Sequence, residues 1–347
     1  MKCEKKFVDV KNELENTTFA KTVLMLLVVF YHCIVFWRGD WFMGDPVISS
    51  KFLAVLSDWL NSFNIYAFAL ISGYLFYFNK YEQGKYRKFL PFTVTKAKRL
   101  LIPYAFVAAV WVIPIQYFFF RYDFETIVKN FVFAMNPNQL WFLWMLFGVS
   151  IVFWLLSDFL VKHEILGTVT MLGIFGIGLV CGMRLPNVFM IWRVCTYLPL
   201  FWCGVKIRQH GSGFLRKIPS LLYLPVQAAL FFLTRWLTEN DPSPFNILYH
   251  GFTFALHICG AVSVFVILQD IADKINWKKN KIFVFLAKLS MPIYLIHQQI
   301  IYFFIVCLNG VIHPFLHVGV NFICVLSISV IVSALLMKWK ITRFLIG

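Results

Sequence analysis

One lysine and one histidine stand inside the first long apolar stretch of the chain, residues 19–37 (FAKTVLMLLVVFYHCIVFW). A helix turns about 100° and rises about 1.5 Å per residue, so Lys21 and His32 lie on nearly the same face, roughly 16 Å apart. Ionisable side chains in a hydrocarbon span are costly and mark candidate functional sites. His32 is therefore a candidate general base, because histidine titrates near neutral pH. The alternative is a structural histidine that only hydrogen-bonds to a neighbouring helix. Lys21 is expected either to contact an anionic group or to extend its ammonium group to the membrane interface.

The most basic segment of the chain follows the second apolar stretch. Lys96 and Arg99 are three residues apart on the predicted start of a helix, so they share a face. A cluster of this kind binds acidic lipid head groups or the phosphates of a soluble cofactor, and both interpretations stay open. The cationic residues of the segment are Lys80, Lys85, Arg87, Lys88, Lys96, Lys98 and Arg99.

Polar residues also occur at the ends of later apolar stretches. Trp141 follows Asn138 and Gln139 where the fourth stretch begins, a position typical of membrane-interface anchors, although the two amides also suit a sugar. Arg193 interrupts the sixth stretch, which contains no acidic residue, so its partner is expected elsewhere in the chain or in a ligand.

A further polar patch lies in the ninth stretch, where Tyr294 and His297 are three residues apart and Gln298 is adjacent. It predicts either a packing network or a part of the substrate site. His250 and His257 share a helix face, but no carboxylate or third ligand can be placed beside them, so no metal site is expected. The eight cysteines show no CxxC spacing and indicate neither a zinc site nor a disulfide framework.

The composition indicates an integral membrane protein. Of the 347 residues, 60% are hydrophobic and 14% are charged, and the mean hydropathy is +0.75. Soluble domains are about half apolar and about a quarter charged. Basic cytoplasmic loops account for the net charge of +16, so no nucleic-acid partner is expected.

A membrane span needs roughly 20 apolar residues. The sequence accordingly predicts an all-α polytopic protein with about ten transmembrane helices. Residues 1–18 are the expected N-terminal tail, residues 19–337 the transmembrane domain and residues 338–347 the C-terminal tail. The expected spans are residues 19–37, 57–78, 100–120, 140–157, 165–182, 187–205, 219–237, 245–268, 282–305 and 318–337.

The distribution of Lys and Arg predicts the orientation. With ten spans, 23 of the 32 Lys and Arg fall in the tails and loops of one side and 6 in the loops of the other. Because cytoplasmic loops carry an excess of positive charge, both termini are expected in the cytoplasm. The protein is expected to be integral to the cytoplasmic (inner) membrane, in contact with membrane lipids.

Taken in order, these segments resemble the acyltransferase family three, membrane enzymes that often O-acetylate bacterial surface sugars. The matches are a basic residue followed after ten residues by histidine (Lys21, His32), the SGYLF end of the second span and the basic KAKRLLIPY start of the third. LWFLWMLF and IYLIHQ follow at the expected places. The resemblance covers residues 16–337.

The resemblance implies the transfer of an acyl group, most often acetyl from acetyl-CoA, to a sugar hydroxyl of a surface glycan or its lipid-linked precursor. It implies His32 and Lys21 as catalytic residues, and a short form without a periplasmic esterase-like domain. The donor is expected at Ser72, Lys96, Lys98 and Arg99, and the acceptor at Trp141, Arg193, Tyr294, His297 and Gln298.

Two positions depart from the family pattern. Lys21 stands where the family usually has arginine preceded by aspartate, and lysine lacks the bidentate fork of arginine. Asn64 stands where a histidine is frequent.

A polysaccharide exporter or flippase is the competing interpretation, but the sequence shows no inverted repeat and no matching pair of broken helices.

Overall fold

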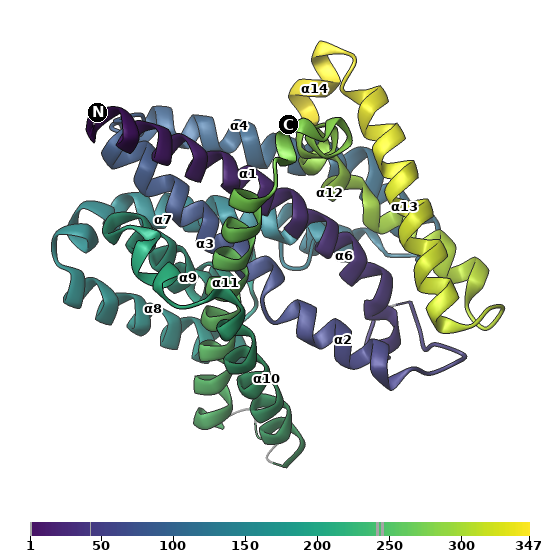
Figure 1. Ribbon diagram of the computed structural model, residues 1–347. Helices are drawn as coiled ribbons and strands as arrows, with labels where there is room; N and C mark the ends of the chain where they lie inside the picture. The colour runs from purple at the N-terminus through teal and green to yellow at the C-terminus, as the bar shows by residue number, and fades with distance from the viewer. Residues whose placement is uncertain (1, 42, 241–242, 244–245) are drawn as a thin grey trace. The chain divides into compact units, whose positions relative to one another are not determined.

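The chain is helical almost throughout. The computed structural model describes residues 2–41, 43–240, 243 and 246–347 (Figure 1), and no strand occurs in these residues, which confirms the predicted all-α class. The α-helices are α1 (Lys2–Ile34), α2 (Lys51–Asn61), α3 (Asn64–Tyr77), α4 (Phe89–Val107), α5 (Ile113–Phe118), α6 (Phe124–Ile127), α7 (Trp141–Lys162), α8 (Glu164–Arg184), α9 (Ile191–His210), α10 (Tyr223–Asn240), α11 (Ile247–Lys274), α12 (Lys281–Leu308), α13 (Pro314–Leu336) and α14 (Lys340–Ile346).

Nine helical segments among the described residues are long and apolar enough to cross a membrane. This confirms a multi-pass membrane protein, whereas the side on which the termini lie stays a prediction. The segments are Glu13–Arg38, Phe89–Phe118, Asn138–Lys162, Glu164–Arg184, Val188–His210, Ser220–Asn240, Ile247–Lys274, Lys281–Leu308 and Pro314–Leu336.

The expected second span, residues 57–78, is divided between two helices. α2 ends at Asn61 and α3 begins at Asn64. The hydroxyl of Ser62 donates to the carbonyl of Trp59 at 2.6 Å and competes with the regular backbone bonds where α2 ends. The 14 residues of α3 extend about 21 Å, less than the roughly 30 Å of a hydrocarbon core. A π-helical turn, Phe78–Glu82, follows α3 directly.

The chain separates into two compact units, which are described one at a time. Unit 1 comprises residues 1–71, 207–290 and 304–324, and unit 2 comprises residues 72–206, 291–303 and 325–347.

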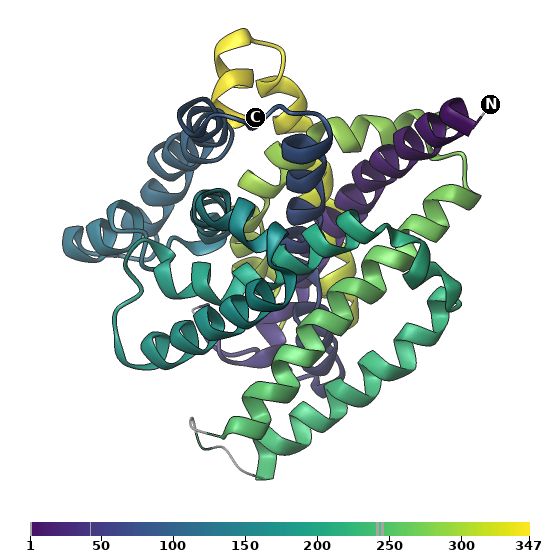
Figure 2. The same cartoon turned by 90° about the vertical axis from the view of Figure 1, so that its left-hand side faces the viewer.

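In unit 1, α1 packs against α11 and α2, and α10 and α11 lie side by side (Figure 2). The polar end of α1 is fixed by charged groups. Arg208 and Ser212 each donate to the Glu13 carboxylate at 2.8 Å, and Asn16 donates to Asp273 on α11. α1 is one continuous helix from Lys2 to Ile34, and its later turns carry Lys21 and His32.

In unit 2, α4 packs against α7 and α14. The buried cluster around α4 includes Leu100, Tyr104, Leu140 and Ile346, so the short C-terminal helix α14 contributes to the same core. The Tyr104 hydroxyl donates to the carbonyl of Phe131 at 2.6 Å, which satisfies a polar group inside this apolar cluster.

Candidate functional site

His32 lies in the last turns of α1 and is half-buried in unit 1. Its Nδ1 lies 2.9 Å from the carbonyl oxygen of Val28, one turn earlier. A carbonyl only accepts hydrogen bonds, so Nδ1 carries the proton of the neutral ring and Nε2 carries the lone pair. This tautomer is the one that a base acting through Nε2 requires. Lys21 is half-buried in the same continuous helix, so the predicted spacing of about 16 Å along one face holds.

An ionic cluster fixes the end of α1 near His32. The Arg38 guanidinium lies near the hydroxyl of Tyr31, whose ring meets that of His32 edge-on with centroids 5.0 Å apart. One Asp58 oxygen lies 3.3 Å from Arg38, and the other accepts from Arg235 on α10 at 2.9 Å. Because η1 (Val35–Arg38), α2 and α10 meet at one carboxylate, the cluster holds the helix end that carries His32.

The basic segment before α4 is anchored in unit 2 by a buried lysine. Lys80, in the π-helical turn, donates to Ser157 at 2.6 Å and pairs with Asp158 at 2.9 Å. Its ammonium lies 4.7 Å from the ring centre of Trp154, whose indole nitrogen donates to the carbonyl of Tyr86 at 2.9 Å. The sequence grouped Lys80 with the other cations of this segment, but its side chain is 7% exposed and joins the segment to α7.

The three cations at the start of α4 do not form one group. The Lys96 ammonium lies 5.7 Å from the ring centre of Tyr86 and 5.6 Å from that of Phe92. Burial raises the pKa of the Tyr86 hydroxyl, and the charge of Arg99 partly opposes this shift. Lys98 is two residues, or about 200°, from Lys96 and lies on the opposite face of the helix. Lys96 and Arg99 therefore share a face beside an aromatic surface, and Lys98 does not belong to it.

Ser72 is half-buried on α3, and its neighbour Gly73 explains the SGYLF motif. A Cβ atom at Gly73 would lie 1.9 Å from the carbonyl oxygen of Phe201 on α9. Only glycine allows the two helix backbones to come this close. The motif thus has a packing role within unit 2 that does not depend on any ligand.

Trp141 and Arg193, which are 52 residues apart in the sequence, are in contact. The guanidinium carbon of Arg193 lies 4.3 Å from the ring centre of Trp141, and the ring of Tyr197 meets Trp141 at 5.8 Å. Arg193 is exposed, and no acidic side chain among the described residues pairs with it. An indole face beside an exposed guanidinium presents one stacking surface and one anion-binding group.

Left-handed backbone precedes both members of this pair. Asn138, three residues before Trp141, has φ 47°, and Met190, three residues before Arg193, has φ 57°. Phe189 has φ 51° and donates its backbone N–H to the carbonyl of Phe133 at 2.8 Å. Such backbone costs about 1–3 kcal/mol per residue and persists where the surrounding structure imposes it, as at ligand sites.

Tyr294 joins two of the sequence motifs in unit 2. Its hydroxyl donates to the backbone carbonyl of Gln139. The Gln139 side chain in turn donates to the carbonyl of Leu295 at 3.0 Å and to the side chain of Gln299 at 2.7 Å. Gln139 thereby fastens the start of α7 to α12. Sequence reasoning missed Gln299, although its spacing of four residues from Leu295 places both on one helix face.

His297 and Gln298 are both buried within α12. Nδ1 of His297 donates to the carbonyl of Tyr294 at 2.7 Å, and the amide of Gln298 donates to the hydroxyl of Tyr302. These two hydrogen bonds link residues of the same helix.

Lys21 and His32 belong to unit 1, whereas the other nine predicted site residues belong to unit 2. Unit 2 brings together Trp141 with Arg193, and separates Lys98 from Lys96. Among the described residues, no group of three His, Cys, Asp or Glu side chains has the arrangement of a metal site.

The Gln139–Gln299 pair gives a testable prediction about stability. Gln139→Leu leaves the buried amide of Gln299 unsatisfied, so we expect the free energy of unfolding to fall by about 1–3 kcal/mol. Adding Gln299→Leu removes both partners and should restore part of that loss, as measured by denaturant unfolding in detergent. Strict additivity of the two single effects would show that the amides are not coupled.

A comparison with protein families identifies the family of the chain. Residues 16–338 match the family model Acyl_transf_3, described as an acyltransferase domain. No curated protein and no solved structure matches the chain. Because the match covers nearly the whole chain, the protein belongs to acyltransferase family 3.

Proposed function

We propose that this membrane acyltransferase moves an acetyl group from cytoplasmic acetyl-CoA to a hydroxyl of a surface glycan or its lipid-linked precursor. The observation that carries the proposal is His32. This side chain lies inside a membrane-spanning helix, and its Nδ1 hydrogen bond to Val28 directs the lone pair of the neutral ring to Nε2.

In the proposed reaction, Nε2 of His32 takes the proton of the sugar hydroxyl while the oxygen attacks the thioester carbonyl. The new C–O bond forms, the C–S bond breaks, and the imidazolium returns the proton to the CoA sulfur. A positioned base contributes about 10²–10⁴-fold to such a step. The Tyr31–Arg38–Asp58 contacts support the helix end that holds the base.

Lys21 has a different role in this proposal. At roughly 16 Å from His32 along the helix, its ammonium cannot share the reacting carbonyl. We assign Lys21 to an anionic part of the donor, near the membrane boundary that the orientation prediction places in the cytoplasm.

We assign the phosphates of CoA to Lys96 and Arg99. The two residues share a helix face beside Tyr86 and Phe92, and charged donors make the strongest hydrogen bonds to phosphate. Ser72 is the last of the proposed donor residues.

We assign the acceptor to the Trp141–Arg193 pair, where an indole suits a sugar ring and a guanidinium suits an acidic or phosphorylated sugar. Tyr294, His297 and Gln298 support this end of unit 2 through α12.

Lys96→Gln should raise the KM for acetyl-CoA about 10-fold or more and leave kcat nearly unchanged. The lysine is proposed to contact a part of the donor that does not change in the reaction, so its loss weakens ground and transition states equally. Release of free CoA by protein in vesicles measures both constants. Lys85→Gln, an exposed cation of the same segment, is the matched control. A fall in kcat with an unchanged KM would contradict the assignment.

The decisive test of the function is the glycan of cells with and without the gene. We expect ester-linked acetyl, read as one acetyl mass per repeat, to be present with the gene and absent without it. If the deletion removes surface polymer instead and leaves the acetylation of the remaining glycan unchanged, the protein is an exporter and the proposal fails.

A further inference from the structure

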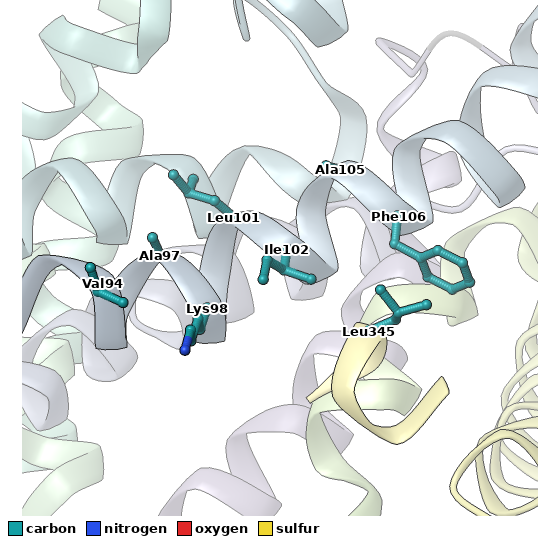
Figure 3. Close-up of a pocket in the computed structure, with 8 residues that line it drawn as sticks. All are labelled: Val94, Ala97, Lys98, Leu101, Ile102, Ala105, Phe106 and Leu345. Atoms are coloured by element: carbon teal, nitrogen blue, oxygen red, sulfur yellow. The ribbon is translucent and has the colours of Figure 1, made fainter. Parts of the chain in front are cut away.

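A groove of about 500 Å³ runs along one face of α4 in unit 2 (Figure 3). Its lining residues on α4 recur every three or four positions and so form a single stripe. They include Val94, Ala97, Lys98, Leu101, Ile102 and Ala105. At one end, the side chain of Phe106 faces Leu345 of α14, which bounds the groove.

The dimensions of the groove fit one acyl chain. Val94 and Phe106 are twelve residues apart, or about 18 Å along the helix. One leaflet of the hydrocarbon core is roughly 15 Å thick. The membrane-spanning segment Phe89–Phe118 has 30 residues, about 45 Å, which is longer than the roughly 30 Å of the hydrocarbon core. We expect its cationic first turns to be the part in the head-group region.

The charged residues around the groove favour an anionic ligand. Lys98 is the only charged residue that lines it, in the part of the chain that the structure describes. No Asp or Glu occurs between Glu82 and Asp123, and α14 (KITRFLI) contains none either. The groove therefore combines an apolar floor with one cation at the polar end of a membrane helix.

We propose that this groove binds an anionic phospholipid, with one acyl chain along α4 and the phosphate at Lys98. The separation of Lys98 from Lys96 supports the assignment, because the two side chains lie on opposite faces of the helix and so can bind different ligands. A second copy of this chain fits less well, because a two-fold contact through the groove would bring Lys98 of both copies together without an acidic partner. The proposal does not depend on the acetyl-transfer reaction.

Native mass spectrometry of the full chain tests the proposal. The protein is released from detergent with phosphatidylglycerol or phosphatidylcholine of the same acyl chains, and the retained lipid is counted. We expect phosphatidylglycerol to be retained, and Lys98→Gln to lower its apparent affinity about five-fold, the contribution of one lysine near an anionic surface. Ala105→Trp fills the groove and should abolish retention.

Each variant has a matched control. Lys85→Gln removes a neighbouring exposed charge, and Ala109→Trp adds the same ring to an exposed position outside the groove, so both should retain lipid like the wild type. Inorganic phosphate should not displace the lipid, because the chain contributes to binding. Displacement by inorganic phosphate, equal retention of phosphatidylcholine, or retention by Ala105→Trp would each overturn the proposal.

Discussion

His32→Ala is expected to lower the rate constant of acetyl transfer by about 10²–10⁴-fold, with little change in the KM for acetyl-CoA. The variant removes the lone pair that accepts the sugar proton, an interaction made only in the transition state. Single-turnover release of CoA by protein in vesicles measures the loss. The same variant should leave cellular glycan without ester-linked acetyl while the protein reaches the membrane at the wild-type level.

A second intramembrane histidine is the matched control. His257 on α11 stacks on Tyr66 with ring centroids 3.7 Å apart, which makes it a packing residue of unit 1. His257→Phe keeps an aromatic ring there and should retain near-wild-type activity. Wild-type rates in His32→Ala would remove the histidine from the mechanism, and equal losses in both variants would point to folding instead of chemistry.

Steady-state kinetics with both substrates distinguish two possible roles of His32, general base and nucleophile. Direct transfer requires both substrates to be bound together and gives sequential kinetics. A covalent acetyl-histidine would give ping-pong kinetics and a labelled His32 when acetyl-CoA is supplied without the acceptor. The direct route is the one we propose.

Most of the helices could be predicted because apolar length alone specifies a span. The second expected span was the exception. Its polar residues lie close to the apolar run of α3, so average hydropathy did not reveal that the helix breaks between Asn61 and Asn64. The π-helical turn at Phe78–Glu82, which buries Lys80, also lacks a sequence signature, because it depends on tertiary contacts with Ser157 and Asp158.

The helix faces on which residues lie were easier to predict than the contacts between helices. Periodicity correctly placed Lys96 and Arg99 on one helix face, but the grouping of Lys98 with them followed charge alone. The sequence also indicated that Arg193 needs a partner outside its own span. That partner is the ring of Trp141, an apolar group that a search for opposite charge overlooks. Pairing across 52 residues depends on packing, which no local pattern encodes.

Gly73→Ala should destabilise the protein by about 3 kcal/mol or more, the largest structural effect that we expect from a single methyl group. The new Cβ would lie 1.9 Å from the oxygen, 2.7 Å from the carbonyl carbon and 3.0 Å from the Cα of Phe201. These are backbone atoms of α9, so no side-chain rotation relieves the overlap and one helix must move. Thermal unfolding in detergent measures the loss.

Gly173→Ala on α8 is the matched control, because a Cβ there meets no atom within 4 Å. Alanine also forms helices more readily than glycine by about 1 kcal/mol, so the control should be neutral or stabilising. The opposite signs expected for one chemical change separate close packing from helix propensity. If both variants unfold like the wild type, α3 and α9 do not approach as described, and the SGYLF motif would then need a role in substrate binding.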